Sequence, residues 1–264
     1  MPFPLAHPAA TLPFRRWCPR YFDFSALVVG SLVPDLAAGI DDWEYFSHTI
    51  LGSFVFCLPV GLLTLWILRQ VRAPLIATLP NPHRDVLLSF RAVAPNSLIQ
   101  IIVSLLLGSW LHIAWDLFTH DHSWLVRYSV LSSVTIEGVR LNHLVWLLSS
   151  IIGVAILFVE YLSLVRKKKR HLRGPSRPDR RAWAFWLGIL LLPFVGAVPL
   201  ALHDPTYYHG AFLPFLAVYY FSCCYVTLGV IGFLVKYLHM QGASGVNKFY
   251  EDGCQGKRSV STGE

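Results

Sequence analysis

Residues 97–122, SLIQIIVSLLLGSWLHIAWDLFTHDH, decide the fold that this sequence predicts. The first half is an uninterrupted apolar run of the kind that crosses a bilayer as a helix. The second half sets His112, Asp116 and His120 at intervals of four, which places them on one face of an α-helix, about one turn apart. Facing lipid would cost each group roughly 2.5 kcal/mol or more, so they need partners inside the protein. A bound metal is the partner that best suits two imidazoles and a carboxylate.

The composition predicts an integral membrane protein. Apolar residues make up 55% of the chain and charged residues 14%, and the mean hydropathy is +0.51, whereas a soluble chain has about 25% charged residues. A net charge of +7 would alone suggest nucleic acid, but the positive residues lie in loops that flank apolar segments, where they orient a membrane protein. We therefore expect a lipid bilayer as partner and no nucleic acid. The sequence leaves the oligomeric state open.

The apolar segments predict an all-α, polytopic membrane helix bundle with about six transmembrane helices. The expected spans are residues 24–40, 50–68, 97–122, 144–165, 182–202 and 211–235. An acidic loop, DDWEYFSH, separates the first two spans, and a basic, proline-containing loop at 69–96 precedes the third. The segment that precedes the first span is short and rich in proline, so we expect it to form an N-terminal arm.

Four parts follow from this pattern. They are a helical membrane domain with the His and Asp cluster (1–165), a basic cytoplasmic loop (166–181), two further transmembrane helices (182–238) and a disordered Gly- and Ser-rich tail (239–264). If the N-terminus lies in the cytoplasm and six spans alternate, 20 of the 22 Lys and Arg residues fall inside, and only Arg127 and Arg140 fall outside. This bias favours cytoplasmic N- and C-termini.

The same topology gathers metal-ligand side chains on the outer side of the membrane. Asp35 lies near the outer end of the first span, and His48 lies at the outer start of the second. One ion joins neighbours at i and i+4 easily, but a third residue one turn further along is geometrically hard to include. We therefore expect His112 and Asp116 to bind the ion with Asp35 and His48. His120 would lie nearer the external water, as a neighbour of the ligands or a proton carrier.

Two other residues are candidates with simpler alternatives. If the N-terminal segment folds back as a helical arm, about 1.5 Å of rise per residue lets His7 climb roughly 12–18 Å from the basic cluster Arg15–Arg20 toward the metal ligands. The alternative is a surface-lying N-terminus with a solvated His7. Glu44 belongs to the acidic loop and is either simply solvated or a neighbour of the ligands that acts as a base. For the His112 face itself, hydrogen bonding between packed helices is the alternative to a metal.

Four segments, MPFPLAHPAA, GSLVPD, SHTILG and GSWLHIAWDLFTH, resemble a bacterial membrane family known as domain of unknown function 4184. They are more remotely similar to the YdjM-like membrane-bound metal-dependent hydrolases, which show an early His, a PD pair, a THS-like element and an HxxxD helix. The resemblance covers roughly residues 1–165 and implies a bacterial inner-membrane protein. The candidate site that it carries over comprises His7, Asp35, His48, His112 and Asp116. This chain has SHT in place of THS and lacks a second acidic residue directly after the PD pair.

The resemblance implies metal-dependent hydrolysis. Imidazole and carboxylate ligands suit Zn²⁺ best, with Mn²⁺ or Fe²⁺ possible, and Asp116 or Asp35 could serve as general base. A site at the membrane–water boundary would meet a lipid-linked or phosphate-ester substrate. Two other classes stay open: a non-catalytic cation-binding or transport protein, and a structural membrane protein with a metal staple. The apolar character of the last three expected spans, with Glu160 near an inner end, favours a one-sided site over a pathway.

Overall fold

The computed structural model describes residues 3–37, 40–80, 82–89, 97–119, 126, 128, 133–136, 139–171, 180–203, 216, 219–238 and 240. Nearly all of these residues are helical. Within the described part of the chain, the β-structure is a two-stranded antiparallel hairpin of β1 (Thr135–Ile136) and β2 (Val139–Arg140), and short turns join the helices. The predicted all-α bundle is therefore confirmed.

Among the described residues, five helices are long and apolar enough to cross a membrane, which indicates a multi-pass membrane protein. They are Ile50–Ala77, Leu98–Asp116, Leu141–Lys167, Ala182–Leu202 and Tyr219–Leu238. The first expected span corresponds to a shorter apolar helix, Phe24–Ala37, which divides into α2 (Phe24–Gly30) and the 3₁₀ helix η2 (Pro34–Ala37). The break precedes Pro34, because a proline disfavours the helical conformation in the residue before it.

The N-terminal arm folds back along α10 (Leu141–His171). It consists of the 3₁₀ helix η1 (Pro4–Thr11) and α1 (Leu12–Trp17). The Phe3 amide donates a hydrogen bond to Ser150 Oγ at 2.9 Å. A Cβ on Gly153 would lie 2.8 Å from the Cβ of Ala6, so only glycine lets η1 approach α10 this closely. Of the two alternatives for the arm, the structure therefore shows the folded-back one.

Two further glycines bring α2 into backbone contact with α7 (Leu98–Asp116). A Cβ on Gly108 would lie 2.3 Å from the carbonyl oxygen of Leu27, and a Cβ on Gly30 would lie 2.2 Å from that of Leu105. Small residues at such a crossing let two membrane helices approach closely. The Ser109 hydroxyl then donates to the Gly30 carbonyl at 3.1 Å. The hydrophobic core lies beside this crossing and includes Val29, Cys57, Leu65, Ile101 and Leu105.

Several element boundaries differ from the sequence-based expectations. The expected acidic loop is mostly helix α3 (Asp41–Ser47), because it contains no Gly or Pro and packs the indole of Trp43 against the ring of Phe46. The second span comprises α4 (Ile50–Gly52), the π-helical stretch η3 (Ser53–Cys57) and α5 (Leu58–Ala77), so it runs past residue 68. Arginine is a good helix former, so Arg69 and Arg72 do not end the helix where it leaves the apolar region. The expected loop also contains α6 (His83–Ser89).

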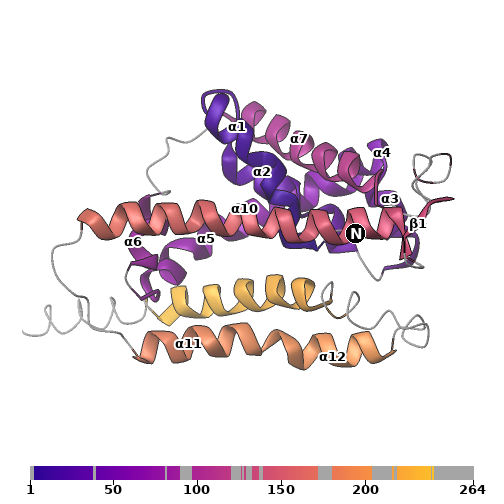
Figure 1. Cartoon of the computed structure of the whole chain (residues 1–264). Coiled ribbons are helices and arrows are strands. Elements are labelled where there is room, and N and C mark those ends of the chain that lie inside the picture. Colours follow the sequence, from indigo (N-terminus) through magenta and orange to yellow (C-terminus); the bar gives the residue numbers. More distant parts are fainter. Residues whose placement is uncertain are drawn as a thin grey trace, which may run out of the picture.

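The C-terminal helices form a separate layer. Figure 1 shows α11 (Arg180–Leu191), α12 (Pro193–His203) and the helix Tyr219–Leu238 (yellow) side by side, on the opposite flank of the bundle from α7. The Tyr220 hydroxyl donates to the Leu190 carbonyl at 2.8 Å, and Tyr225 Oη lies 2.8 Å from Thr64 Oγ1 on α5. The layer is therefore attached to the remainder of the bundle through α5, and Trp183 on α11 also packs edge-on against His83 of α6. The expected disordered tail from residue 241 onward lies outside the described residues.

Candidate metal centre

Four side chains from three separate segments converge where α7 ends. His112 and Asp116 lie on the last turn of α7, Asp35 lies in η2, and His48 directly follows α3. One possible ligand atom from each of the four lies within 4.8 Å of the corresponding atoms of the other three, so the cluster could hold a metal ion. These are the four residues that the sequence analysis expects to share an ion.

The distances among the four side chains match the space around a small cation. The Nε2 atom of His112 lies 3.1 Å from an Asp116 oxygen, 3.3 Å from an Asp35 oxygen and 3.2 Å from His48 Nε2. His48 Nε2 lies 3.3 Å from the same Asp116 oxygen and 3.7 Å from the same Asp35 oxygen. Four tetrahedral ligands at about 2.1 Å from an ion are about 3.4 Å apart. The cluster therefore has the size of one zinc-like coordination sphere.

Backbone carbonyls determine which nitrogen of each imidazole faces the cluster. The Nδ1 atom of His112 lies 2.8 Å from the Ser31 carbonyl oxygen, and that of His48 lies 2.7 Å from the Glu44 carbonyl oxygen. A carbonyl oxygen accepts but cannot donate, so Nδ1 carries the proton in both rings. In the neutral rings, both Nε2 lone pairs then point at each other and at carboxylate oxygens. Such facing lone pairs repel one another unless a cation lies between them. The hydrogen bonds from Nδ1 to backbone carbonyls are the second layer of contacts usually found around metal-bound histidines.

The burial of Asp35 supports the same conclusion. Asp35 is fully buried, and neither of its carboxylate oxygens accepts a hydrogen bond from a described residue. A buried ionised carboxylate without compensation is costly, so buried charges are paired or coordinate metals. Burial alone lowers the pKa of His48, but the carboxylates of Asp116 and Asp35 raise it to about 9. The cluster therefore attracts positive charge, which either a proton or a metal ion can supply.

His7 lies against the cluster but does not belong to the group of four. Its ring stacks on the His112 ring with centroids 3.8 Å apart, and its Nε2 lies 3.8 Å from an Asp116 oxygen. That oxygen, Oδ1, is not the one that faces His112 and His48. Burial lowers the pKa of His7 to about 3, so the ring is neutral. The structure thus places His7 against the His112 ring and beside the Asp116 oxygen that does not face His112 Nε2 and His48 Nε2.

The backbone directly after His48 is irregular, and this irregular segment positions the His48 side chain. Thr49 caps α4 by accepting from the Gly52 amide, so the chain turns sharply after His48. A Cβ on Gly52 would lie 1.8 Å from the Phe46 carbonyl oxygen, so this turn requires glycine. The π-helical stretch η3 follows, and the indole N–H of Trp110 on α7 donates to Ser53 Oγ at 3.0 Å. π-Helical turns inside α-helices are frequent at functional sites.

His120 and Glu44, which the sequence analysis expects beside the ligands, are not among the four clustered residues. Helix α7 ends at Asp116, with a turn over residues 117–119, so the common helical face expected for three residues ends after two. His120 lies outside the described residues. Glu44 lies on α3, and its backbone carbonyl accepts a hydrogen bond from His48 Nδ1. The sequence analysis considered only the side chain of Glu44 and so could not predict this role. The carbonyl of Ser31 was likewise missed, because no sequence motif marks a backbone acceptor.

Comparisons with known proteins give one match. The family model described as "Domain of unknown function (DUF4184)" matches residues 1–240. No curated protein matches the chain. No solved structure matches it either. The remoter similarity to YdjM-like hydrolases is not shown by these comparisons and stays a prediction.

Proposed function

The chain belongs to the DUF4184 family, and from its His/Asp cluster we propose that it is a metal-dependent hydrolase of the bacterial inner membrane. The observation that carries this proposal is the orientation of the two imidazoles. Backbone carbonyls hold the Nδ1 protons of His112 and His48, so both Nε2 lone pairs meet two carboxylates in one buried space. A cluster of four such acceptors attracts positive charge, which a divalent metal ion would supply.

Zinc suits this donor set best. Two imidazole nitrogens and carboxylate oxygens are common zinc ligands, whereas Mn²⁺ prefers carboxylate and water oxygens, and Fe²⁺ is the alternative that accepts the same donors. His48, His112, Asp35 and Asp116, the last through Oδ2, would hold the ion. Bound zinc supplies Lewis-acid activation of water and of the scissile ester at neutral pH.

Asp116 is the residue best placed to move a proton. Its Oδ2 faces His112 and His48, whereas its Oδ1 faces His7 at 3.8 Å. In ester hydrolysis, the oxygen of water bonds to phosphorus, the bond from phosphorus to the ester oxygen breaks, and a proton passes to the leaving alcohol. Asp116 Oδ1 would take the proton from water and return it to the leaving group. The neutral ring of His7 would orient this carboxylate. Asp35 is the alternative base, since its carboxylate oxygens are buried in the same cluster as those of Asp116.

The rival function, cation transport, needs a polar route from the cluster across the bilayer. Buried serines do lie on α7 below His112, at positions 104 and 109. Each serine hydroxyl, however, donates to backbone carbonyls, Ser104 to Gln100 and Ser109 to Gly30 and Leu105. These bonds fix the two hydroxyls in helix packing, and Ser104 Oγ already accepts from the Asp23 amide at 2.9 Å, so the serines serve to join the helices. They favour a one-sided site.

The decisive experiment is metal analysis of purified protein. We expect about one zinc per chain in the wild type and almost none in His112→Ala or Asp116→Asn. His143→Ala is the matched control, because His143 lies exposed at the start of α10 and should leave metal content unchanged. Zinc-loaded protein should then hydrolyse p-nitrophenyl phosphate esters, with the rate lost on chelation. Absence of metal from the wild type even after zinc dialysis would contradict the proposal.

A further inference from the structure

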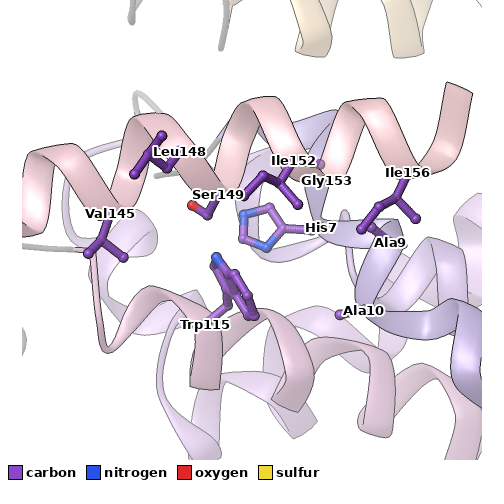
Figure 2. Close-up of a pocket in the computed structure, with 11 residues that line it drawn as sticks. His7, Ala9, Ala10, Trp115, Val145, Leu148, Ser149, Ile152, Gly153 and Ile156 are labelled. Carbon is purple, nitrogen blue, oxygen red and sulfur yellow. The ribbon is translucent and has the colours of Figure 1, made fainter.

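A cavity of about 390 Å³ lies beside the candidate metal centre, between η1, α7 and α10. Figure 2 shows that His7 forms part of its wall, with Trp115 on one side and the α10 residues Ser149 and Ile152 on the other. Among the lining residues only His7, Ser149 and, through its indole N–H, Trp115 carry polar side-chain atoms, and the Ser149 hydroxyl donates to the Trp146 carbonyl. The interior surface of the cavity is therefore almost wholly apolar.

The cavity opens toward the bilayer. Its α10 wall includes Leu148, Ile152 and Ile156, whose side chains are exposed by 56%, 55% and 46%. Helix α10 is one of the candidate spans, so exposed apolar side chains at its middle face lipid. A lipid can enter such a cavity laterally, whereas a water-soluble ligand would have to leave water to reach it.

The cavity and the metal cluster share a wall. His7 lines the cavity, stacks on His112 and approaches Asp116, and Trp115 precedes Asp116 on α7. His7 Nε2 is buried and accepts or donates no hydrogen bond within the described part of the chain. A molecule with its apolar part in the cavity would therefore have its polar end near Asp116.

We infer that the cavity binds an alkyl chain of a membrane lipid whose ester head group is the substrate of the cluster. This inference rests on the proposed function and narrows its substrate class from phosphate esters in general to lipids. An apolar cavity of this volume lies in the usual range for small-molecule sites. Because the chain arrives from the bilayer, van der Waals contacts with the cavity wall rather than removal of apolar surface from water would hold it there.

Photolabelling tests the inference directly. Full-length protein is reconstituted in vesicles of phosphatidylethanolamine and phosphatidylglycerol, doped with a phosphatidylethanolamine that carries a diazirine midway along one acyl chain. After irradiation, mass spectrometry should find adducts on the η1 residues Ala9 and Ala10, which line the cavity behind α10. Adducts on Val226 and Val230, which are exposed on the C-terminal helix, provide the reference for ordinary surface lipid.

Two neighbouring residues on α10 give a matched pair of variants. Ile152 lines the cavity and Ile151 does not, yet their side chains are exposed by nearly equal fractions, 55% and 58%. Ile152→Trp should lower labelling of η1 about tenfold relative to the reference residues, because overpacking by 1.4 kcal/mol changes an equilibrium constant by that factor. Ile151→Trp should leave labelling of η1 unchanged. Ala9→Phe narrows the cavity from the opposite wall and replaces Ile152→Trp if that variant fails to fold.

Metal content measured on the same samples separates this inference from the proposed function. Labelling of η1 in protein that binds no metal would support the lipid cavity and contradict the hydrolase. Bound zinc with η1 labelled no more than the reference residues would contradict the lipid cavity and leave the hydrolase standing. Equal effects of the two tryptophan variants would also overturn the lipid cavity.

Discussion

The helices before residue 171 and the C-terminal layer differ in where they place polar groups. Every polar or charged residue that the described structure buries lies between positions 7 and 150. The helix Tyr219–Leu238 is instead largely exposed, with 6% of its apolar window buried. A bilayer tolerates buried ionisable groups only where the protein compensates them, so their location marks function. The comparison places the candidate metal centre among the helices before residue 171, whereas the helix Tyr219–Leu238 contributes mostly exposed apolar surface.

Glycine substitutions sharpen this comparison with the largest expected effect. In Gly108→Leu, the new side chain overlaps the Leu27 carbonyl and pushes α2 away from α7. We expect the free energy of unfolding in detergent to fall by roughly 3 kcal/mol, which is at the upper end for overpacking. Bound metal should also be lost, because the Ser31 carbonyl moves away from His112. Gly188→Leu on α11 is the control, since its Cβ meets nothing within 4 Å. Similar losses in both variants would erase the distinction between the regions.

Removal of bound metal should give the next largest change in the free energy of unfolding. With free zinc at 100 times its Kd, binding stabilises the folded state by about 2.7 kcal/mol, and a chelator should abolish that gain in the wild type. Thermal unfolding in detergent measures it. His112→Ala should show no response to zinc, whereas Cys223→Ser in the C-terminal layer should respond like the wild type. A zinc response that survives in His112→Ala would place the ion elsewhere.

His7 tests how far the site extends toward the N-terminal arm. Because His7 contacts Asp116 but lies outside the group of four, His7→Ala should weaken zinc affinity about tenfold, as loss of a group that positions a ligand does. His48→Ala should weaken it more. Competition with a zinc-binding dye measures both. A loss in His7→Ala as large as in His48→Ala would make His7 a ligand.

The smallest effect is expected at the junction of the two regions. Tyr225→Phe removes the hydroxyl that lies 2.8 Å from Thr64 Oγ1 and should cost about 1 kcal/mol of stability, the usual net value of one hydrogen bond. Metal content should stay at the wild-type value. Unfolding in detergent and metal analysis of the same preparation check the two statements. Loss of metal in this variant would show that the C-terminal layer supports the site.

The membrane fold and the four clustered residues could be predicted from the sequence, because hydropathy and helical spacing are local properties. The apolar half of residues 97–122 specifies a span, and the i, i+4 spacing puts His112 and Asp116 on one face. Charge placement on alternating sides then brought Asp35 and His48 to the same end. These arguments need only chain order and span direction.

Tertiary structure alone decided how close those groups come and which atoms face inward. The backbone contact at Gly30 and Gly108 sets the Ser31 carbonyl against His112, and no pattern in the sequence specifies that acceptor. The fold-back of the arm was one of two alternatives in the sequence, and packing of Ala6 on Gly153 decided it. The cavity beside His7 exists only because η1, α7 and α10 meet there. The length and hydropathy of the apolar runs fix which residues enter a membrane, whereas side-chain volumes and backbone contacts across helices fix their final arrangement.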